Sequence, residues 1–165
     1  MLSEYHNALD RLGSAGWTVH LQTTPQSLPS IIENRFSWIP AEVKQLIMEL
    51  QTAVSPDETA WLLGTPDYLN SSSSAFKWNE WELMSLDAVQ GKPTLERSIQ
   101  RFWDFHFPVA NSVKSGYAYF AVRQADFCIV CGEEPEFEEP KVVASSFLEL
   151  LRLLAKHDAK LSRWL

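Results

Sequence analysis

Cysteine is scarce in this chain, and long apolar runs are missing. Cys128 and Cys131 are its only cysteines, which is too few for a disulfide-stapled scaffold. No apolar stretch is long enough to span a bilayer. Residues 1–6 also lack the basic region and the apolar core of a signal peptide. We therefore expect a cytoplasmic protein with reduced thiols and no membrane partner.

Basic residues are also few. The 14 lysines and arginines are outnumbered by 21 acidic residues, which gives a formal net charge of -7. A general nucleic-acid-binding protein needs a basic face, so this balance argues against a nucleic-acid partner. An acidic protein instead suits a basic protein partner, because opposite fields speed the encounter. The alternative interpretation is that the charge only keeps the protein soluble.

Motifs for catalysis or metal binding are missing as well. Cys128 and Cys131 match C-x-x-C, but β-branched residues between them predict a strand, in which residues three apart face opposite sides. A zinc site would need two more ligands, and the histidines are isolated in the sequence: His6, His20, His106 and His157. There is no nucleophile elbow and no phosphate-binding loop. We predict buried structural cysteines, no metal, no cofactor and no enzymatic activity.

Apolar residues recur at helical spacing in several segments. One buried stripe follows Pro40 and consists of Val43, Leu46, Ile47 and Leu50. A second stripe precedes Pro108 and consists of Leu95, Ile99, Phe102 and Trp103. Further helices are predicted at residues 3–12, 30–34 and 146–154. Ser146 and Glu149 form a capping box at the start of the last one.

Other apolar runs predict strands, at residues 17–21, 59–63, 117–123, 127–132 and 142–144. The runs at 117–123 and 127–132 are joined by a short connection and are apolar on both faces, which predicts neighbouring central antiparallel strands. Residues 78–86 fit a helix or a strand. A length of 165 residues with 45% hydrophobic residues suits one globular domain. We predict a single α+β domain over residues 1–165, with a mainly antiparallel central sheet covered by helices.

An acidic segment follows the run at 127–132. It contains Glu133, Glu134, Glu136, Glu138 and Glu139. Pro135 and Pro140 keep it from being a regular strand or helix, and Phe137 can anchor it to the core. We predict that these carboxylates bind lysines and arginines of a partner protein. The alternatives are a solvated turn, or a network fixed by Arg97, Arg101 or Arg123.

Tryptophan is abundant, with seven in the chain. Tryptophan is enriched at binding hot spots, and it is also an ordinary core residue. Trp78, Trp81 and Trp164 lie outside the clearest apolar stripes and are the candidates for an exposed position. We include Trp78 and Trp81 in the predicted partner-binding site, with a core role as the alternative for both.

Four segments together resemble one known family. They are W-I-P-A-E-V-K-Q-L-I at 38–47, G-Y-A-Y-F-A at 116–121, G-E-E-P-E-F-E-E at 132–139 and V-A-S-S-F at 143–147. This pattern resembles the SUKH superfamily, which contains the Smi-one/Knr-four-like domains, over residues 36–154. Two departures stand out. Val43 occupies a position where the family usually has an aromatic residue, and residues 52–56 replace the Asn-Gly that commonly follows that helix.

The resemblance implies a protein-binding function. Many bacterial members of the family are immunity proteins that bind and neutralise a cognate toxin, and a fungal branch regulates cell-wall synthesis. The resemblance therefore implies an immunity-type protein, and the acidic charge suits a basic toxin such as a nuclease. The alternatives are a regulatory or scaffold module for an endogenous cytosolic protein, or a small-ligand or peptide binder with a pocket over the sheet.

Overall fold

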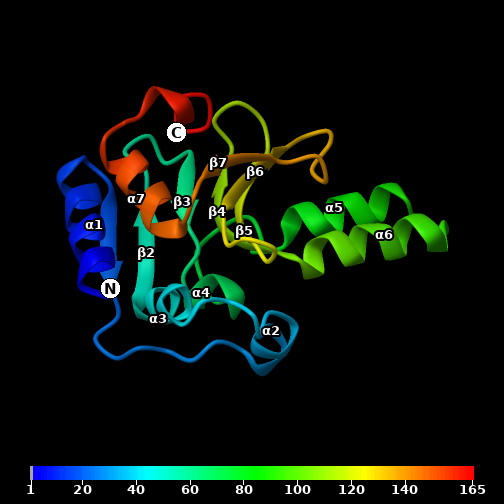
Figure 1. Ribbon diagram of the computed structural model, residues 1–165, viewed down its shortest axis with the longest axis horizontal. Helices are drawn as coiled ribbons and strands as arrows, with labels where there is room; N and C mark the ends of the chain where they lie inside the picture. The colour runs from blue at the N-terminus through cyan, green and yellow to red at the C-terminus, as the bar shows by residue number, and fades with distance from the viewer. Residues whose placement is uncertain (1) are drawn as a thin grey trace.

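The chain forms an α+β fold around one antiparallel sheet, as predicted. The computed structural model describes residues 2–165. Seven strands follow one another across the sheet in sequence order, and every neighbouring pair is antiparallel (Figure 1). The strands are β1 (Thr18–Leu21), β2 (Leu50–Val54), β3 (Ala60–Leu62), β4 (His106–Ser112), β5 (Ala118–Arg123), β6 (Ile129–Glu133) and β7 (Lys141–Ala144).

Five of these strands match predicted segments, whereas β2 and β4 were not predicted. The helices are α1 (Leu2–Ser14), α2 (Ser30–Arg35), α3 (Ala41–Glu49), α4 (Thr65–Tyr68), α5 (Glu80–Ala88), α6 (Pro93–Asp104) and α7 (Phe147–Ala155), followed by the 3₁₀ helix η1 (Ala159–Leu161). The ambiguous segment 78–86 thus contains most of a helix, α5. No helix among residues 2–165 is both long and apolar enough to cross a membrane.

Helices α1 and α7 pack together and cover one face of the sheet (Figure 1). Each has one apolar face, and Leu12 of α1 and Leu150 of α7 are completely buried. The predicted cap of α7 is confirmed, because the Ser146 hydroxyl accepts a hydrogen bond from the Glu149 amide at 3.1 Å. Such a cap satisfies one of the free amides of the first turn. The two helices therefore place the main core on this side of the sheet.

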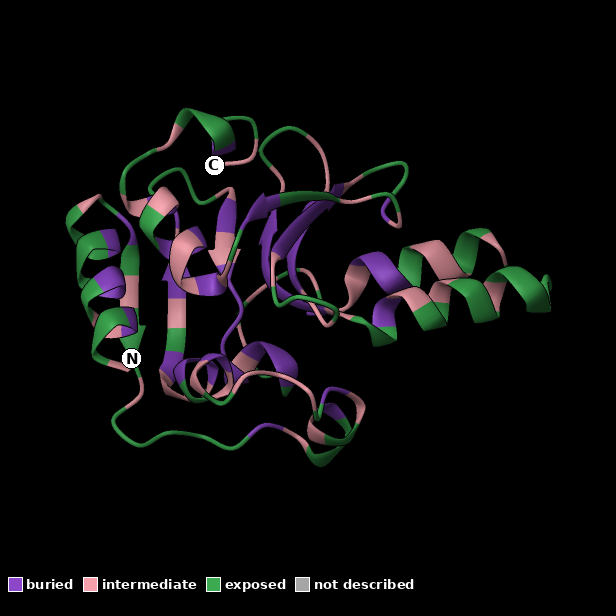
Figure 2. Cartoon of the chain, in the orientation of Figure 1, coloured by how far each residue is buried: buried purple, intermediate pink, exposed green. Residues whose placement is uncertain are grey.

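Helices α5 and α6 form a hairpin that projects from the body of the molecule (Figure 2). Its far end is mostly exposed, so the predicted stripe of α6 is buried only at its base. Trp103 is buried, Ile99 and Phe102 are half-buried, and Leu95 is 47% exposed. The expectation of a fully buried stripe is wrong here, because this stretch of α6 packs against its hairpin partner α5 and projects with it away from the sheet (Figure 2).

A charged cluster fastens the base of this hairpin to α2. The Arg35 guanidinium donates two hydrogen bonds to the Glu82 carboxylate, at 3.0 and 2.7 Å. It donates a third to Asp104 at 2.8 Å. Glu82 is buried and Asp104 is exposed. Arg35 therefore joins α2 to both helices of the hairpin.

Candidate functional site

The acidic segment begins at Glu133, the last residue of β6, and continues through the connection to β7; we call residues 133–140 the acidic loop. Phe137 is buried and stacks against Trp81, with ring centroids 5.7 Å apart and planes 16° apart. The Phe137 carbonyl also accepts a hydrogen bond from the Tyr119 hydroxyl. The predicted anchoring of this loop by Phe137 is therefore confirmed.

Three of the five glutamates in this loop are bound to the rest of the molecule. Glu133 accepts a hydrogen bond from the Trp164 indole at 3.0 Å, and Glu138 accepts one from the Trp103 indole at 2.9 Å. Glu134 accepts a hydrogen bond from the amide of Tyr117 at 3.2 Å. These three carboxylates hold the loop in place and are already engaged within the fold.

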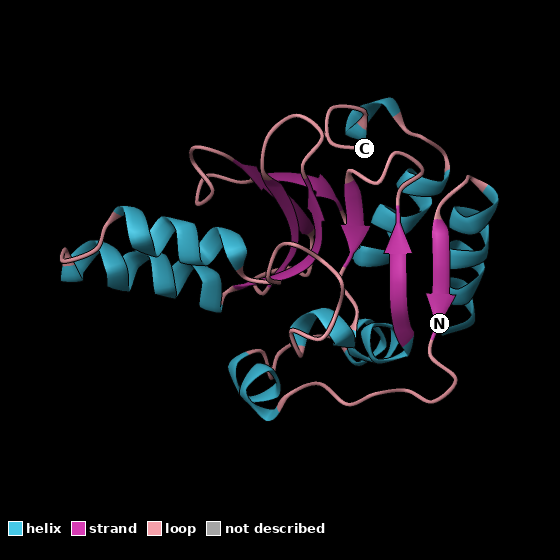
Figure 3. Ribbon diagram, turned by 180° about the vertical axis from the view of Figure 1, so that it is seen from behind, coloured by secondary structure: helices cyan, strands magenta, loops and turns pink. Residues whose placement is uncertain are grey.

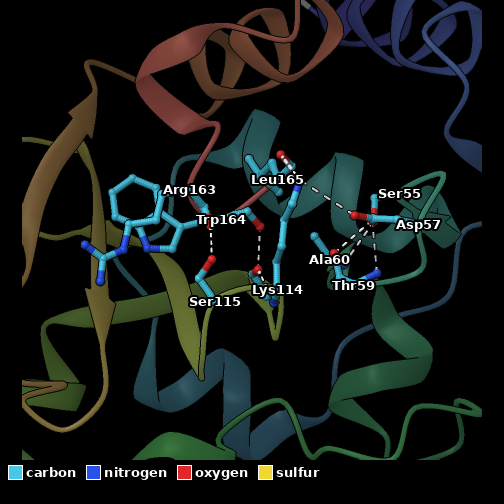
Figure 4. Close-up of polar contacts among 10 residues, drawn as sticks. Ser55, Asp57, Thr59, Ala60, Lys114, Ser115, Arg163, Trp164 and Leu165 are labelled. Atoms are coloured by element: carbon cyan, nitrogen blue, oxygen red, sulfur yellow. Dashed lines mark hydrogen bonds and ion pairs between the residues drawn. The ribbon is translucent and has the colours of Figure 1, made fainter.

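The C-terminal segment, which supplies Trp164, is itself held by Lys114 and Ser115 (Figure 4). Lys114 donates to the carbonyl of Leu165 at 2.7 Å and lies 3.7 Å from the Asp57 carboxylate. Ser115 donates to the carbonyl of Arg163 at 2.8 Å. These contacts hold the last residues beside β6, where the Arg163 guanidinium lies 3.2 Å from the carboxylate of Glu133, the first glutamate of the loop.

This arginine is not one of those proposed from the sequence. Arg123 pairs instead with Asp126 at 2.7 Å. Neither Arg97 nor Arg101 forms an ion pair within residues 2–165. The sequence does not predict Arg163 as the partner of Glu133, because the two residues are thirty positions apart in the chain. A network does exist, and it uses the C-terminal segment.

Glu134, Glu136 and Glu139 are exposed, and the last two are the ones that the contacts above leave out. Within the described part of the chain, neither forms an ion pair or a side-chain hydrogen bond. Beyond the loop, Val142 on the edge strand β7 is 48% exposed. The part of the predicted site that is both exposed and free of internal contacts is therefore two carboxylates beside a sheet edge.

Trp78 and Trp81 are both core residues, so their predicted place in the partner-binding site is wrong and the alternative, a core role, is confirmed. Trp78 is 8% exposed and packs against Phe36 and Tyr68, with ring centroids 6.1 and 5.6 Å away. Trp81 is 1% exposed, and its indole donates to the Asn111 side chain at 3.2 Å. Neither can contact a partner without rearrangement of the core.

A cavity of about 670 Å³ lies over β2 and β3. Thr52, Val54 and Trp61 line it, and they alternate along the strands with core residues such as Ala53 and Ala60. Because successive strand residues face opposite sides, the cavity lies on the face turned away from α1 and α7. Figure 3 shows that face of β1–β3 without a covering helix. The alternative of a pocket over the sheet named no residues, because the walls of this cavity come from segments far apart in the chain.

Stacked aromatic rings connect the cavity to the acidic loop. Trp61 stacks on Phe76 with centroids 6.0 Å apart, and Phe76 packs against Trp81 at 5.3 Å. Trp81 in turn stacks on Phe137. The two candidate surfaces therefore share one face of the sheet and one row of rings.

The two cysteines are both free. Cys131 is buried in β6, and burial raises the pKa of its thiol far above its ordinary value. Cys128 precedes the strand and is half-buried, not fully buried as expected. No group of three or more histidine, cysteine, aspartate or glutamate residues placed to hold a metal ion occurs among residues 2–165.

Comparisons of the chain with protein family models, with curated proteins and with solved structures found no match.

Proposed function

We propose that this protein is a non-enzymatic, immunity-type binding domain of the SUKH kind, which binds and neutralises a basic toxin through the acidic loop. The observation that carries the proposal is the division of the five glutamates. Three fix the loop, and two, Glu136 and Glu139, extend from it exposed and without an internal counter-charge. The resemblance to the SUKH superfamily supports the protein-binding role.

A fixed acidic loop suits fast and selective association. Exposed carboxylates attract a basic surface over distances of several ångströms and raise the rate of encounter. Because Phe137 and three glutamates already hold the loop, little conformational entropy is lost when a partner binds it. Val142 adds an exposed apolar side chain at the adjacent edge. The proposed interface therefore combines charge with a rigid backbone.

The test is charge reversal at the two exposed positions, Glu136→Lys with Glu139→Lys. The partner is first captured from native cells with the tagged wild-type protein, at low and at high salt, and is identified by mass spectrometry. Its affinity for each variant is then measured by calorimetry at several salt concentrations. We expect affinity to fall by about tenfold or more and its salt dependence to flatten, because two attractive charges become repulsive.

The matched control is Asp10→Lys with Asp87→Lys, which changes the net charge equally at exposed positions on α1 and α5. This control should retain most of the wild-type affinity. Equal losses in both variants would mean that only net charge matters, and an unchanged affinity in the loop variant would remove the acidic loop from the interface. A housekeeping protein as the captured partner would favour a regulatory module in place of an immunity protein.

A further inference from the structure

The cavity over β2 and β3 has the size of a small-molecule site. Its volume of about 670 Å³ falls within the range of roughly 300–1,000 Å³ that is usual for ligand pockets. Strands β2 and β3 form its floor, and α4 with the serine-rich loop at 71–76 forms one wall. This serine-rich loop therefore borders the cavity.

The ionisable residues that line this cavity are all acidic. They are Glu58 and Asp67, and no lysine, arginine or histidine is among the described residues that line it. The other polar lining groups are neutral amides and hydroxyls, such as Gln51 and Ser73. Phosphates and carboxylates would find no counter-charge here. The lining favours a ligand that carries positive charge.

Asp67 is a buried carboxylate without a basic partner. It is 8% exposed, and one oxygen accepts a hydrogen bond from the Gly64 amide at 2.9 Å. No lysine, arginine or histidine of residues 2–165 lies within ion-pair distance of it. Burial raises the pKa of this carboxyl group. A buried charge without a counter-charge is unfavourable, and a cation in the cavity would relieve that cost.

Aromatic rings supply a second feature that attracts cations. Trp61 and Phe76 both line the cavity and stack on each other with planes 18° apart. Tryptophan is the side chain whose ring face attracts cations most strongly. Glu58 lies on the turn between β2 and β3 and has a left-handed backbone with φ of 59°, a conformation that is unusual for glutamate. Its exposed carboxylate completes the acidic lining.

We propose that this cavity binds a small organic cation carrying an ammonium or guanidinium group, with Asp67 and Glu58 as counter-charges and Trp61 as the aromatic surface. This site is separate from the acidic loop and does not depend on the function proposed for that loop. Free amines and basic side chains of short peptides share this chemistry, so both are tested.

The experiment measures thermal stabilisation and calorimetric affinity of the full chain with choline, spermidine, agmatine and a Gly-Arg-Gly peptide. The comparison ligands are the neutral analogue of choline, in which a tert-butyl group replaces the trimethylammonium, and inorganic phosphate. We expect at least one cation to raise the melting temperature in a saturable way and the neutral analogue and phosphate to have no effect. Preference for the peptide over the free amines would identify a peptide site.

The decisive variant is Asp67→Asn, which keeps an oxygen for the Gly64 amide but removes the charge. We expect the cation affinity to fall at least tenfold while the melting temperature without ligand stays equal or rises. Glu58→Gln, at an exposed position, provides a second variant and should weaken binding severalfold. Asp87→Asn on α5 is the control and should bind as the wild type does. If no cation binds, or if Asp67→Asn and Glu58→Gln bind as tightly as the wild type, the proposal is wrong.

Discussion

Replacing Arg35 with methionine tests how the projecting hairpin is held. The substitution removes three hydrogen bonds, two to Glu82 and one to Asp104. The Glu82 side chain is 6% exposed, so its charge would lose its partner in a buried place. Loss of one member of a buried pair costs about 3–5 kcal/mol. We expect Arg35→Met to lower the free energy of unfolding by about that amount.

Three variants together isolate the contribution of the Arg35–Glu82 pair to stability. Urea unfolding at neutral pH gives the free energies for Arg35→Met, for Glu82→Met and for the double variant. The double variant should recover to within about 1–2 kcal/mol of the wild type, because apolar replacement of both buried charges is often neutral. Asp104→Asn is the control. Asp104 is 52% exposed, so its exposed ion pair should contribute less than about 1 kcal/mol.

A cost of less than about 1 kcal/mol for Arg35→Met, or a double variant as unstable as the sum of the single ones, would show that the pair does not hold the hairpin. Native-state hydrogen exchange adds a spatial readout. Exchange should accelerate most in α5 and α6, because the Arg35 contacts join their base to α2.

Further predictions concern one glycine and two aspartates. Gly64→Ala would place a Cβ 2.2 Å from the Leu50 carbonyl oxygen, so a loss of about 1–3 kcal/mol is expected in urea unfolding. Burial raises the pKa of Asp67, so wild-type stability gains from its protonation as the pH falls through the folded pKa toward 3.8. The advantage of Asp67→Asn in unfolding experiments should shrink over that range. A hydrogen bond from Ser55 lowers the pKa of Asp57 to about 2, so its stabilisation is present above 3.8 and is lost as the pH falls toward 2. Asp57→Asn should remove that acid-sensitive part of the stability curve.

Local patterns were sufficient for the elements whose signals lie within one segment. The cap at Ser146 depends on Glu149, only three positions away. The pairing of β5 with β6 depends on two apolar runs that a short connection joins. Strand β4 was missed because Pro108 argues against a central strand. The structure accommodates Pro108 where the pairing of β4 with β5 shifts register. Its carbonyl accepts a hydrogen bond from Tyr68, which is distant in sequence.

Strand β2 was missed for a different reason. Leu50 completes the apolar stripe of α3 at helical spacing, yet it is the first residue of β2. The backbone changes from helix to strand without an intervening turn, so no glycine or proline marks the boundary. Leu50 is buried in β2. An apolar residue at this position suits the buried face of a helix as well as that of a strand, so its apolar character could not distinguish the two.

The candidate site shows most clearly what composition cannot provide. The sequence predicts one partner-binding surface that consists of the five glutamates with Trp78 and Trp81. In the structure, two other tryptophans donate hydrogen bonds to the acidic loop. The Trp103 indole donates to Glu138, and the Trp164 indole donates to Glu133. A carboxylate held by such a hydrogen bond is less available to the basic groups of a partner protein. Charge reversal at Glu138 would therefore perturb folding as well as binding, whereas Glu136 and Glu139 test the interface alone.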